Sequence, residues 1–279
     1  MTSLATAPES ASASASASAA ASASGTTHTL ERALAILRAF DGRTAPVTHS
    51  EIVKRTGYSK ASVSRIAYTL VSLGYLARDV DGVRFRMGVR GRMLGHTYRA
   101  NSPVSAIARP IMQAFADRHD MSMALGIGDG TEMLYLEYAK SPGTSTLCFS
   151  VGKRLKMEVS ALGRAYLWGL PEAERRRLLE RIADRGKAST AGALERTELA
   201  FGKLASEGWC LAAGEYQRET YGIAVPVRLG SPALPMSLSC AAMLPVRDER
   251  EIRETIVPAL KATAERLRSS LAGVDSELF

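Results

Sequence analysis

One predicted helix in the first third of the chain has an unusual outward face. In TGYSKASVSRIAYTLVSLGYL, residues 56–76, apolar residues recur at helical spacing, and the opposite side carries no carboxylate. Solvated helix faces usually mix Glu with Lys, so this face favours an acidic partner. Arg65 can donate two hydrogen bonds to guanine O6 and N7 or bind a phosphate, and the Tyr68 hydroxyl can reach a phosphate. The residues expected to contact such a partner are Ser59, Lys60, Ala61, Ser62, Ser64, Arg65, Tyr68 and Thr69.

Three predicted helices place this face in a helix-turn-helix. Thr48 and Glu51 have the spacing of a capping box at the start of the second helix. Gly57 ends that helix, and Ser59 can cap the third. A short helix, a tight glycine turn and a helix with a polar outward face are the parts of a helix-turn-helix unit. The predicted helices span residues 27–40, 47–56 and 59–73.

A basic hairpin follows the third helix directly. Residues 75–78 and 83–87 are predicted short strands on either side of Asp81-Gly82, which is a strong turn signal. Arg84 and Arg86 on the second strand are expected to contact the same acidic partner. The sequence therefore predicts a winged helix-turn-helix over residues 27–88. The alternative for Arg65 is an ion pair inside this domain, and one sequence does not separate contacts that position a protein on DNA from contacts that read bases.

Charge is distributed unevenly along the chain. Residues 1–99 contain 13 Lys and Arg against 6 Asp and Glu, whereas residues 100–279 contain 23 against 22. A basic third joined to a neutral remainder indicates a nucleic-acid module attached to a second function, with a basic surface kept for solubility as the alternative. Residues 1–26, an Ala/Ser tract, have little to bury and are expected to form a disordered tail. No signal peptide or membrane span is predicted, so we expect a cytoplasmic protein.

A different pattern begins after the predicted winged domain. Residues 89–101 form a weak helix, a connector that Gly91 and Gly95 are expected to soften. Strands, three helices, further strands and a long final helix then describe an α+β domain with a mostly antiparallel sheet over residues 102–275. The three cysteines are odd in number and far apart, so they build neither a disulfide framework nor a metal site.

Enzyme chemistry is not indicated by the sequence. The GIGDG segment at residues 126–130 lacks the dinucleotide-binding glycine pattern and fits a hairpin turn. The four histidines are scattered, and none lies near a nucleophile elbow or a zinc-binding motif. We therefore expect no catalytic residues, no metal and no cofactor. An architectural DNA-binding protein without a ligand is the remaining alternative, but it would not need a large neutral second domain.

Six segments together resemble the IclR family of transcriptional regulators over about residues 27–275. They are TLERALAILRAF, EIVKRTGYSKASVSRIAYTLVSLGYL, LGRAYLWGLPEAER, ELAFGKLASEGWCLAAGE, IAVPV and MSLSC. Each is weak alone, but their order and spacing are specific. The resemblance implies a ligand-responsive regulator that binds a palindromic operator in double-stranded DNA as a homodimer or homotetramer. It also implies that the second domain is GAF-like and senses a small organic acid, with RNA polymerase as a further candidate partner.

The resemblance also implies where the small molecule binds. The backbone amides of Ala161 and Leu162 would meet the ligand carboxylate, since a helix N-terminus presents free N–H groups and partial positive charge. Ser237 and Ser239 match paired hydroxyls on a pocket strand. The alternatives are a plain helix start at Ala161 and serines that face away from the pocket.

Two positions depart from family members that bind small oxo-acids. Where those members carry an Asp and a Cys, this chain has Ala212 and Gly222, so two polar anchors are lost. We therefore expect a larger, more apolar acid, with an aromatic acid as one candidate. The residues expected to form an apolar lining, which are equally suited to the core, are Met133, Leu147, Phe149 and Met157.

Overall fold

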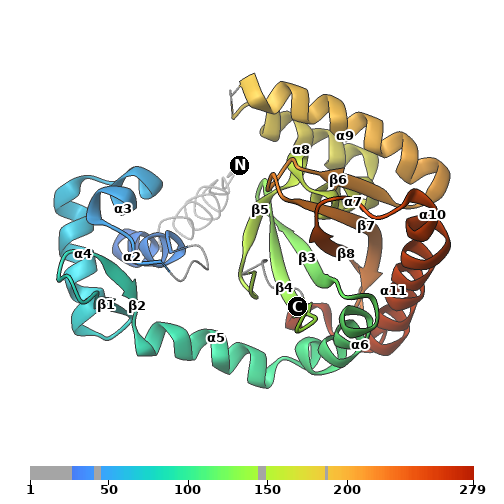
Figure 1. Cartoon of the computed structure of the whole chain (residues 1–279). Helices are drawn as coiled ribbons and strands as arrows, with labels where there is room; N and C mark the ends of the chain where they lie inside the picture. Colours follow the sequence, from blue (N-terminus) through green and yellow to red (C-terminus); the bar gives the residue numbers. More distant parts are fainter. Residues whose placement is uncertain (1–26, 41–44, 144–148, 186–187) are drawn as a thin grey trace, which may run out of the picture. The chain divides into compact units, whose positions relative to one another are not determined.

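The computed structural model describes residues 27–40, 45–143, 149–185 and 188–279. The chain divides between Leu94 and Gly95 into two compact units, whose elements are labelled in Figure 1. The first unit holds a helix-turn-helix, and the second holds a six-stranded sheet with helices on both faces. Each unit has a hydrophobic core of its own.

The first unit begins with the three helices that the sequence predicts. The Thr48 side chain accepts a hydrogen bond from the Glu51 backbone N–H, and the Glu51 carboxylate accepts one from the Thr48 backbone N–H, so the predicted capping box is confirmed. Gly57 ends the second helix with φ of +71°, a conformation that glycine adopts without strain. Ser59 caps the third helix by accepting from the Ser62 N–H. The helices are α2 (His28–Arg38), α3 (His49–Thr56) and α4 (Lys60–Ser72).

One side of α4 fills the core of this unit. Val63, Ile66 and Leu70 are at most 6% exposed and form the stripe that apolar spacing predicts. They pack with Ile36 from α2 and Ile52 from α3 in one cluster. Burial of an aliphatic side chain of this size stabilises a fold by about 1.5–3 kcal/mol. This stripe therefore fixes which side of α4 faces solvent.

A two-stranded antiparallel hairpin follows α4. Its strands are β1 (Leu76–Arg78) and β2 (Phe85–Met87). The second strand starts later than predicted, because the Asp81 carboxylate accepts hydrogen bonds from the backbone N–H groups of Val83 and Arg84. These two residues belong to the turn instead of the ladder.

The helix α5 (Val89–Asn101) starts directly after the hairpin. Gly91 is not the softening position that we expect from the sequence. A Cβ atom there would lie 2.6 Å from the Met87 side chain and 2.7 Å from the Tyr75 carbonyl oxygen, so glycine is needed for α5 to approach the hairpin. A Cβ atom at Gly95 would have nothing within 4 Å.

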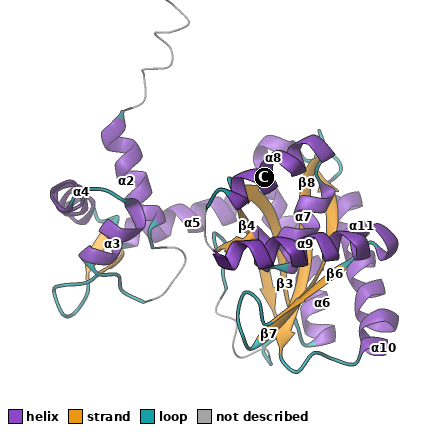
Figure 2. Ribbon diagram, turned by 90° about the horizontal axis from the view of Figure 1, so that it is seen from above, coloured by secondary structure: helices purple, strands orange, loops and turns teal. Residues whose placement is uncertain are grey.

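The second unit is an antiparallel sheet in the order β5-β4-β3-β8-β7-β6, which confirms the predicted α+β class. Helices α6 and α11 cover one face, and α7 lies on the other beneath α8 and α9 (Figure 2). The strands are β3 (Ser122–Asp129), β4 (Glu132–Lys140), β5 (Arg154–Lys156), β6 (Cys210–Ala213), β7 (Thr220–Leu229) and β8 (Leu234–Met243). The helices are α6 (Pro103–His119), α7 (Ala161–Gly169), α8 (Glu172–Ala183), α9 (Ala188–Glu207), α10 (Glu249–Glu251) and α11 (Val257–Leu271).

Small residues bring α7 close to the sheet. A Cβ atom at Gly126 in β3 would lie 2.7 Å from the Leu162 side chain. At Gly163 it would lie 2.3 Å from the Cα atom of Met157, in the short 3-10 turn that precedes α7. Neither position accepts a larger residue without a shift of its neighbours. The first turn of α7 is therefore held directly above the strands that line the pocket described below.

Candidate functional site

The exposed side of α4 carries most of the side chains that the sequence assigns to an acidic partner. Tyr68 is 73% exposed, and Arg65 is exposed without an ion pair inside the described residues. The Ser64 hydroxyl lies 2.9 Å from Nε2 of His49 on α3, which links the two helices. Ser62 differs from the expectation, because it lies on the core side of α4 and is buried. The other members of the predicted set, Ser59, Lys60, Ala61 and Thr69, are exposed.

The two arginines of the hairpin are tied to aspartates of the same hairpin. Arg86 pairs with Asp79, and Arg84 Nε donates to the Asp81 carboxylate at 2.5 Å. Hydrogen bonds from the Arg84 backbone and side chain, and then from the Val83 backbone, lower the pKa of Asp81 to about 2. Asp81 is therefore charged at neutral pH. An incoming phosphate would have to compete with these aspartates for Arg84 and Arg86.

A hydrophobic groove of about 450 Å³ lies beside the exposed face of α4. Leu30, Leu34, Leu73 and Leu94 line this groove and are 46% to 60% exposed. Arg65 also lines the groove, so it lies at the border between the groove and the exposed face of α4. Contiguous exposed apolar surface marks a site of association.

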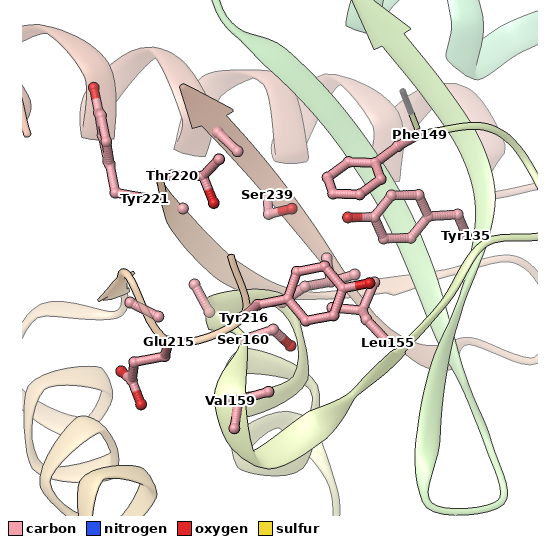
Figure 3. Close-up of a pocket in the computed structure, with 15 residues that line it drawn as sticks. Tyr135, Phe149, Leu155, Val159, Ser160, Glu215, Tyr216, Thr220, Tyr221 and Ser239 are labelled. Atoms are coloured by element: carbon pink, nitrogen blue, oxygen red, sulfur yellow. The ribbon is translucent and has the colours of Figure 1, made fainter. Parts of the chain in front are cut away.

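A pocket lies in the second unit where the first turn of α7 meets the sheet (Figure 3). Its cavity measures about 50 Å³. That volume holds water molecules but not an aromatic ring, since a benzene-binding cavity is about 150 Å³. Four predicted effector-binding residues line it, namely Ala161, Leu162, Ser239 and Phe149. The other lining residues are Tyr135, Leu155, Val159, Ser160, Ala212, Glu215, Tyr216, Thr220, Tyr221, Gly222 and Ala241.

The first turn of α7 has two unused amides, and both belong to residues that line this pocket. The Ser160 side chain accepts from the Gly163 N–H at 3.1 Å, and the Ser160 carbonyl accepts from the Arg164 N–H. In the part of the chain that the structure describes, the N–H groups of Ala161 and Leu162 have no acceptor. These amides and the partial positive charge of the helix start can together hold an anion.

Glu215 is the carboxylate among the lining residues, and two arginines neutralise it. Arg164 on α7, with its side chain 2% exposed, donates to both Glu215 oxygens at 2.8 and 2.6 Å. Arg196 on α9 donates to the same carboxylate at 2.6 Å. Burial raises the pKa of Glu215, but the bonds from Arg164 and Arg196 outweigh burial and lower it. Two positive charges against one negative charge leave a net positive cluster beside the pocket, which favours an anionic ligand.

Aromatic rings form another wall of the pocket. The rings of Tyr135 and Phe149 meet edge to face with centroids 5.9 Å apart, and the Phe149 ring lies 6.0 Å from that of Tyr216. Tyr138 stacks on Tyr135 at 6.0 Å. These spacings are those of favourable aromatic pairs. Because Tyr135 is on β4, Phe149 precedes β5 and Tyr216 lies between β6 and β7, separate segments assemble the wall (Figure 3).

The two serines of β8 lie in different surroundings. Ser239 lines the pocket, whereas Ser237 is outside the lining and fully buried. The Ser237 hydroxyl donates to the Leu162 carbonyl oxygen at 2.8 Å. Ser237 therefore ties the first turn of α7 to the sheet, and Ser239 is the serine available to a ligand.

The remaining predicted pocket residues are distributed unevenly. Met133 and Met157 are fully buried in the core cluster around α7, and neither lines the cavity. Leu147 lies outside the described residues. Ala212 and Gly222 are opposite each other in β6 and β7, and both line the pocket. These two positions therefore offer no polar side chain.

Of the lining residues that are absent from the set predicted from the sequence, Tyr135, Glu215 and Tyr216 supply the aromatic and charged groups described above. Glu215 and Tyr216 lie in a loop, where no periodicity indicates the direction of a side chain. One usable signal is Arg164 in the otherwise apolar start of α7. A buried arginine there requires a carboxylate partner, although the sequence does not say which one.

The described residues give little support for a metal site, a reactive thiol or a membrane-spanning helix. No group of three or more His, Cys, Asp or Glu in these ranges is placed to hold a metal ion. Cys210 and Cys240 are free and buried, and burial raises the pKa of each thiol to about 12, so neither is a thiolate at neutral pH. No helix of the described ranges is both long and apolar enough to cross a membrane.

The two units together define a class of protein. A winged helix-turn-helix with an exposed arginine on α4, followed by a separate domain with an anion-favouring pocket, is the architecture of a DNA-binding transcriptional regulator. Residues 29–80 match the IclR helix-turn-helix domain, and residues 96–269 match the C-terminal domain of bacterial IclR transcriptional regulators. The chain belongs to the IclR family.

Related proteins extend over most of the chain. The Pca regulon regulatory protein of Pseudomonas putida is 28% identical over 251 residues, which cover 88% of this chain and 84% of that protein. An IclR-family regulator structure from Brucella abortus is 28% identical with a TM-score of 0.73, covering 88% and 93% of the two chains. An IclR homologue from Microbacterium hydrocarbonoxydans, solved in complex with 4-hydroxybenzoate, is 23% identical with a TM-score of 0.64, covering 87% and 98%. The comparisons confirm the predicted family and a regulatory role in place of an enzymatic one.

Proposed function

We propose that this protein is a ligand-responsive transcriptional regulator. It binds a palindromic operator in double-stranded DNA as a homodimer, or as a tetramer of two such pairs. A small carboxylic acid with an aromatic or otherwise apolar body controls that binding. The observation that carries this proposal is the first turn of α7, where Ala161 and Leu162 line an aromatic-walled pocket and have unused backbone amides. A cytoplasmic location follows from this role, and RNA polymerase is a further candidate partner.

The exposed face of α4 supplies the DNA contacts. Arg65 reads a guanine or holds a phosphate, because its guanidinium has no ion-pair partner within the described ranges. Tyr68 and Ser64 offer hydroxyls to phosphates or base edges, and Lys60 at the helix start suits the DNA backbone. Arg84 of the wing contributes less than Arg65, since aspartates already pair with it.

The second unit binds the effector through its carboxylate and its apolar body. The carboxylate accepts hydrogen bonds from the Ala161 and Leu162 amides, and the net positive cluster at Glu215 adds attraction. The rings of Phe149 and Tyr216 pack against the apolar body. The 4-hydroxybenzoate bound by the Microbacterium protein is an acid of this class.

Ligand entry requires the pocket to change, because a cavity of about 50 Å³ is too small for an aromatic acid. Tyr216 stands at the cavity and directly follows Glu215, which is bonded to Arg164 on α7 and Arg196 on α9. A ligand that displaces Tyr216 therefore acts on bonds to both helices. The ligand therefore binds two arrangements of the domain with different free energies. Control of DNA binding requires such a difference.

The groove lined by Leu30, Leu34, Leu73 and Leu94 is proposed as a contact between two copies of the chain. A palindrome requires two copies of α4 at a spacing of about one DNA turn or a multiple of it. The groove borders α4, so a contact there sets this spacing. A two-fold dimer brings the same patch of each copy together, and four exposed leucines are complementary to themselves.

A gel-shift experiment with the full chain tests the proposal. The DNA lies upstream of the protein's own gene, and the acids compared are benzoate and the small oxo-acid pyruvate. Benzoate should raise the unfolding temperature, since a ligand at 100 times its Kd adds about 2.7 kcal/mol, and it should change operator affinity. Pyruvate should do neither at the same concentration. A chain that binds no operator, or whose operator affinity ignores bound benzoate, contradicts the proposal.

A further inference from the structure

Two residues with unused hydroxyl groups line the effector pocket. Tyr135 and Ser239 line it and are each only 7% exposed. Among the described residues neither hydroxyl has a hydrogen-bond partner. Figure 3 shows the Tyr135 hydroxyl between Phe149 and Tyr216, directed across the pocket toward Ser239. Both residues line the cavity and their hydroxyls have no protein partner there within the described ranges, so a polar atom of a bound ligand can bond to them.

The sheet brings these two hydroxyls to one side of the pocket. Tyr135 on β4 and Ser239 on β8 flank β3, where their register partners are Gly126 and Ala124. Neither of these β3 residues has a polar side chain, so β3 offers no internal partner to the hydroxyls. The first turn of α7 supplies the separate carboxylate site at Ala161.

The chemistry of the two hydroxyls defines what they can bind. Burial raises the pKa of Tyr135, and the nearby Tyr138 and Tyr216 add to this effect, so the phenol is neutral at physiological pH. A neutral phenol donates one hydrogen bond, and a serine hydroxyl can accept one. A ligand hydroxyl can satisfy both, because it accepts from one neighbour and donates to the other.

We propose that the effector is a hydroxy-substituted aromatic carboxylic acid and that Tyr135 and Ser239 select its ring hydroxyl. The ring hydroxyl accepts a hydrogen bond from Tyr135 and donates one to Ser239, while the carboxylate binds the amides of Ala161 and Leu162. This assignment rests on the proposed function, since it uses the same pocket and the same carboxylate site. An acid without the ring hydroxyl leaves both protein hydroxyls unpaired, and sites built to bind a hydroxyl discriminate strongly against such analogues.

Calorimetric titration of the full chain with 4-hydroxybenzoate and with benzoate tests the assignment. The unsubstituted protein should bind 4-hydroxybenzoate at least about tenfold more tightly than benzoate. Tyr135→Phe should weaken 4-hydroxybenzoate binding about tenfold and leave benzoate binding nearly unchanged. Ser239→Ala should show the same selective loss, and it keeps the test available if Tyr135→Phe does not fold.

Tyr166→Phe is the matched control, because it makes the same chemical change in the same domain. Tyr166 is on α7 and does not line the pocket. It should change the affinity for neither acid. Equal losses for both acids in Tyr135→Phe would mean that Tyr135 holds the carboxylate or supports the fold, and they overturn the assignment.

The remaining outcomes separate the assignment from the proposed function. Benzoate binding with no gain from the ring hydroxyl overturns the roles of Tyr135 and Ser239 and leaves the aromatic-acid proposal standing. Binding of neither acid overturns the proposed effector class, and the hydroxyl assignment with it.

Discussion

The exposed face of α4 and the pocket beneath α7 are both suited to anions, but they are built in different ways. On α4, Arg65 stands in solvent without an ion pair among the described residues. At the pocket, Arg164 is buried and already bonded to Glu215, and the groups left for a ligand are neutral amides and hydroxyls. One site therefore offers a free cation at the surface, and the other offers hydrogen-bond donors beside a buried arginine that is already paired.

The difference follows from what each site is proposed to bind. DNA keeps its phosphates largely in solvent, and exposed cations bind it by releasing counterions. A small acid must enter a dry cavity, where an unpaired buried cation would be very unfavourable before the ligand arrives. Fixed amides avoid that penalty, because they are preorganised and carry only partial charge.

The largest expected effect is the loss of folding stability in Arg164→Ala, which tests the buried charge at the pocket. The substitution leaves the carboxylate of Glu215, which is 14% exposed, with Arg196 as its remaining cationic partner. Removal of one partner from a buried ion pair destabilises a protein by about 3–5 kcal/mol, and the Arg196 bond keeps the loss near the lower figure. Urea unfolding followed by the fluorescence of Trp168 and Trp209, both in the second unit, measures the change.

Arg268→Ala is the control for that measurement. Arg268 pairs with Glu265 at 2.6 Å on α11, and both side chains are more than half exposed. Exposed ion pairs contribute about 0–1 kcal/mol. Equal losses of unfolding free energy in Arg164→Ala and Arg268→Ala would contradict the claim that the buried ion pair stabilises the fold more than the exposed one.

A smaller effect is expected for operator affinity, where Arg65→Ala is compared with Arg84→Ala. Arg65→Ala should weaken specific binding by about 1–3 kcal/mol if Arg65 reads a guanine. Arg84→Ala should cost less, because Asp79 and Asp81 already pair with Arg84. Fluorescence anisotropy with labelled operator measures both. A larger loss of operator affinity in Arg84→Ala than in Arg65→Ala would contradict the account of the wing. Dissociation of the dimer in Arg65→Ala would mean that Arg65 acts in the groove between two copies instead of on DNA.

The smallest expected effect is a pH dependence carried by Glu215. Its pKa is lowered in the folded protein from an ordinary value of 4.5. The carboxylate therefore stabilises the folded state fully above about pH 4.5, and this contribution is lost as the pH falls further, through the folded pKa. Unfolding followed by tryptophan fluorescence should show a steeper loss below pH 4.5 in the unsubstituted protein than in Arg164→Ala. Parallel curves would mean that Arg164 does not set this pKa.

The sequence predicts the first unit better than the pocket, for physical reasons. The Thr48–Glu51 capping box and the buried stripe through Val63 depend on local spacing, and both are confirmed. Ser62 is predicted on the outward side but is buried, because it lies at the margin between the core side and the outward side of α4. Spacing alone does not decide burial at that margin.

The pocket depends on contacts that spacing along the chain does not encode. The register of β3 and β4 shifts between Leu125 and Gly126, which interrupts the alternation of side chains along β4. Tyr135 and Tyr138 stack although they are three residues apart, so strict alternation would have separated them. Ala161 and Ser239 could be placed at a pocket only through the resemblance to a family.

The central claim is that an acid in the pocket controls DNA affinity, and linkage tests it most directly. Binding energies are reciprocal, so operator DNA must change the ligand's Kd by the same factor by which the ligand changes the operator's Kd. Calorimetric titration of the full chain with 4-hydroxybenzoate, with and without saturating operator, measures one factor, and operator titration with and without the acid measures the other. The account predicts that the two Kd values change, and that they change by the same factor. Identical ligand isotherms with and without operator would contradict it and show that the bound acid does not control DNA affinity.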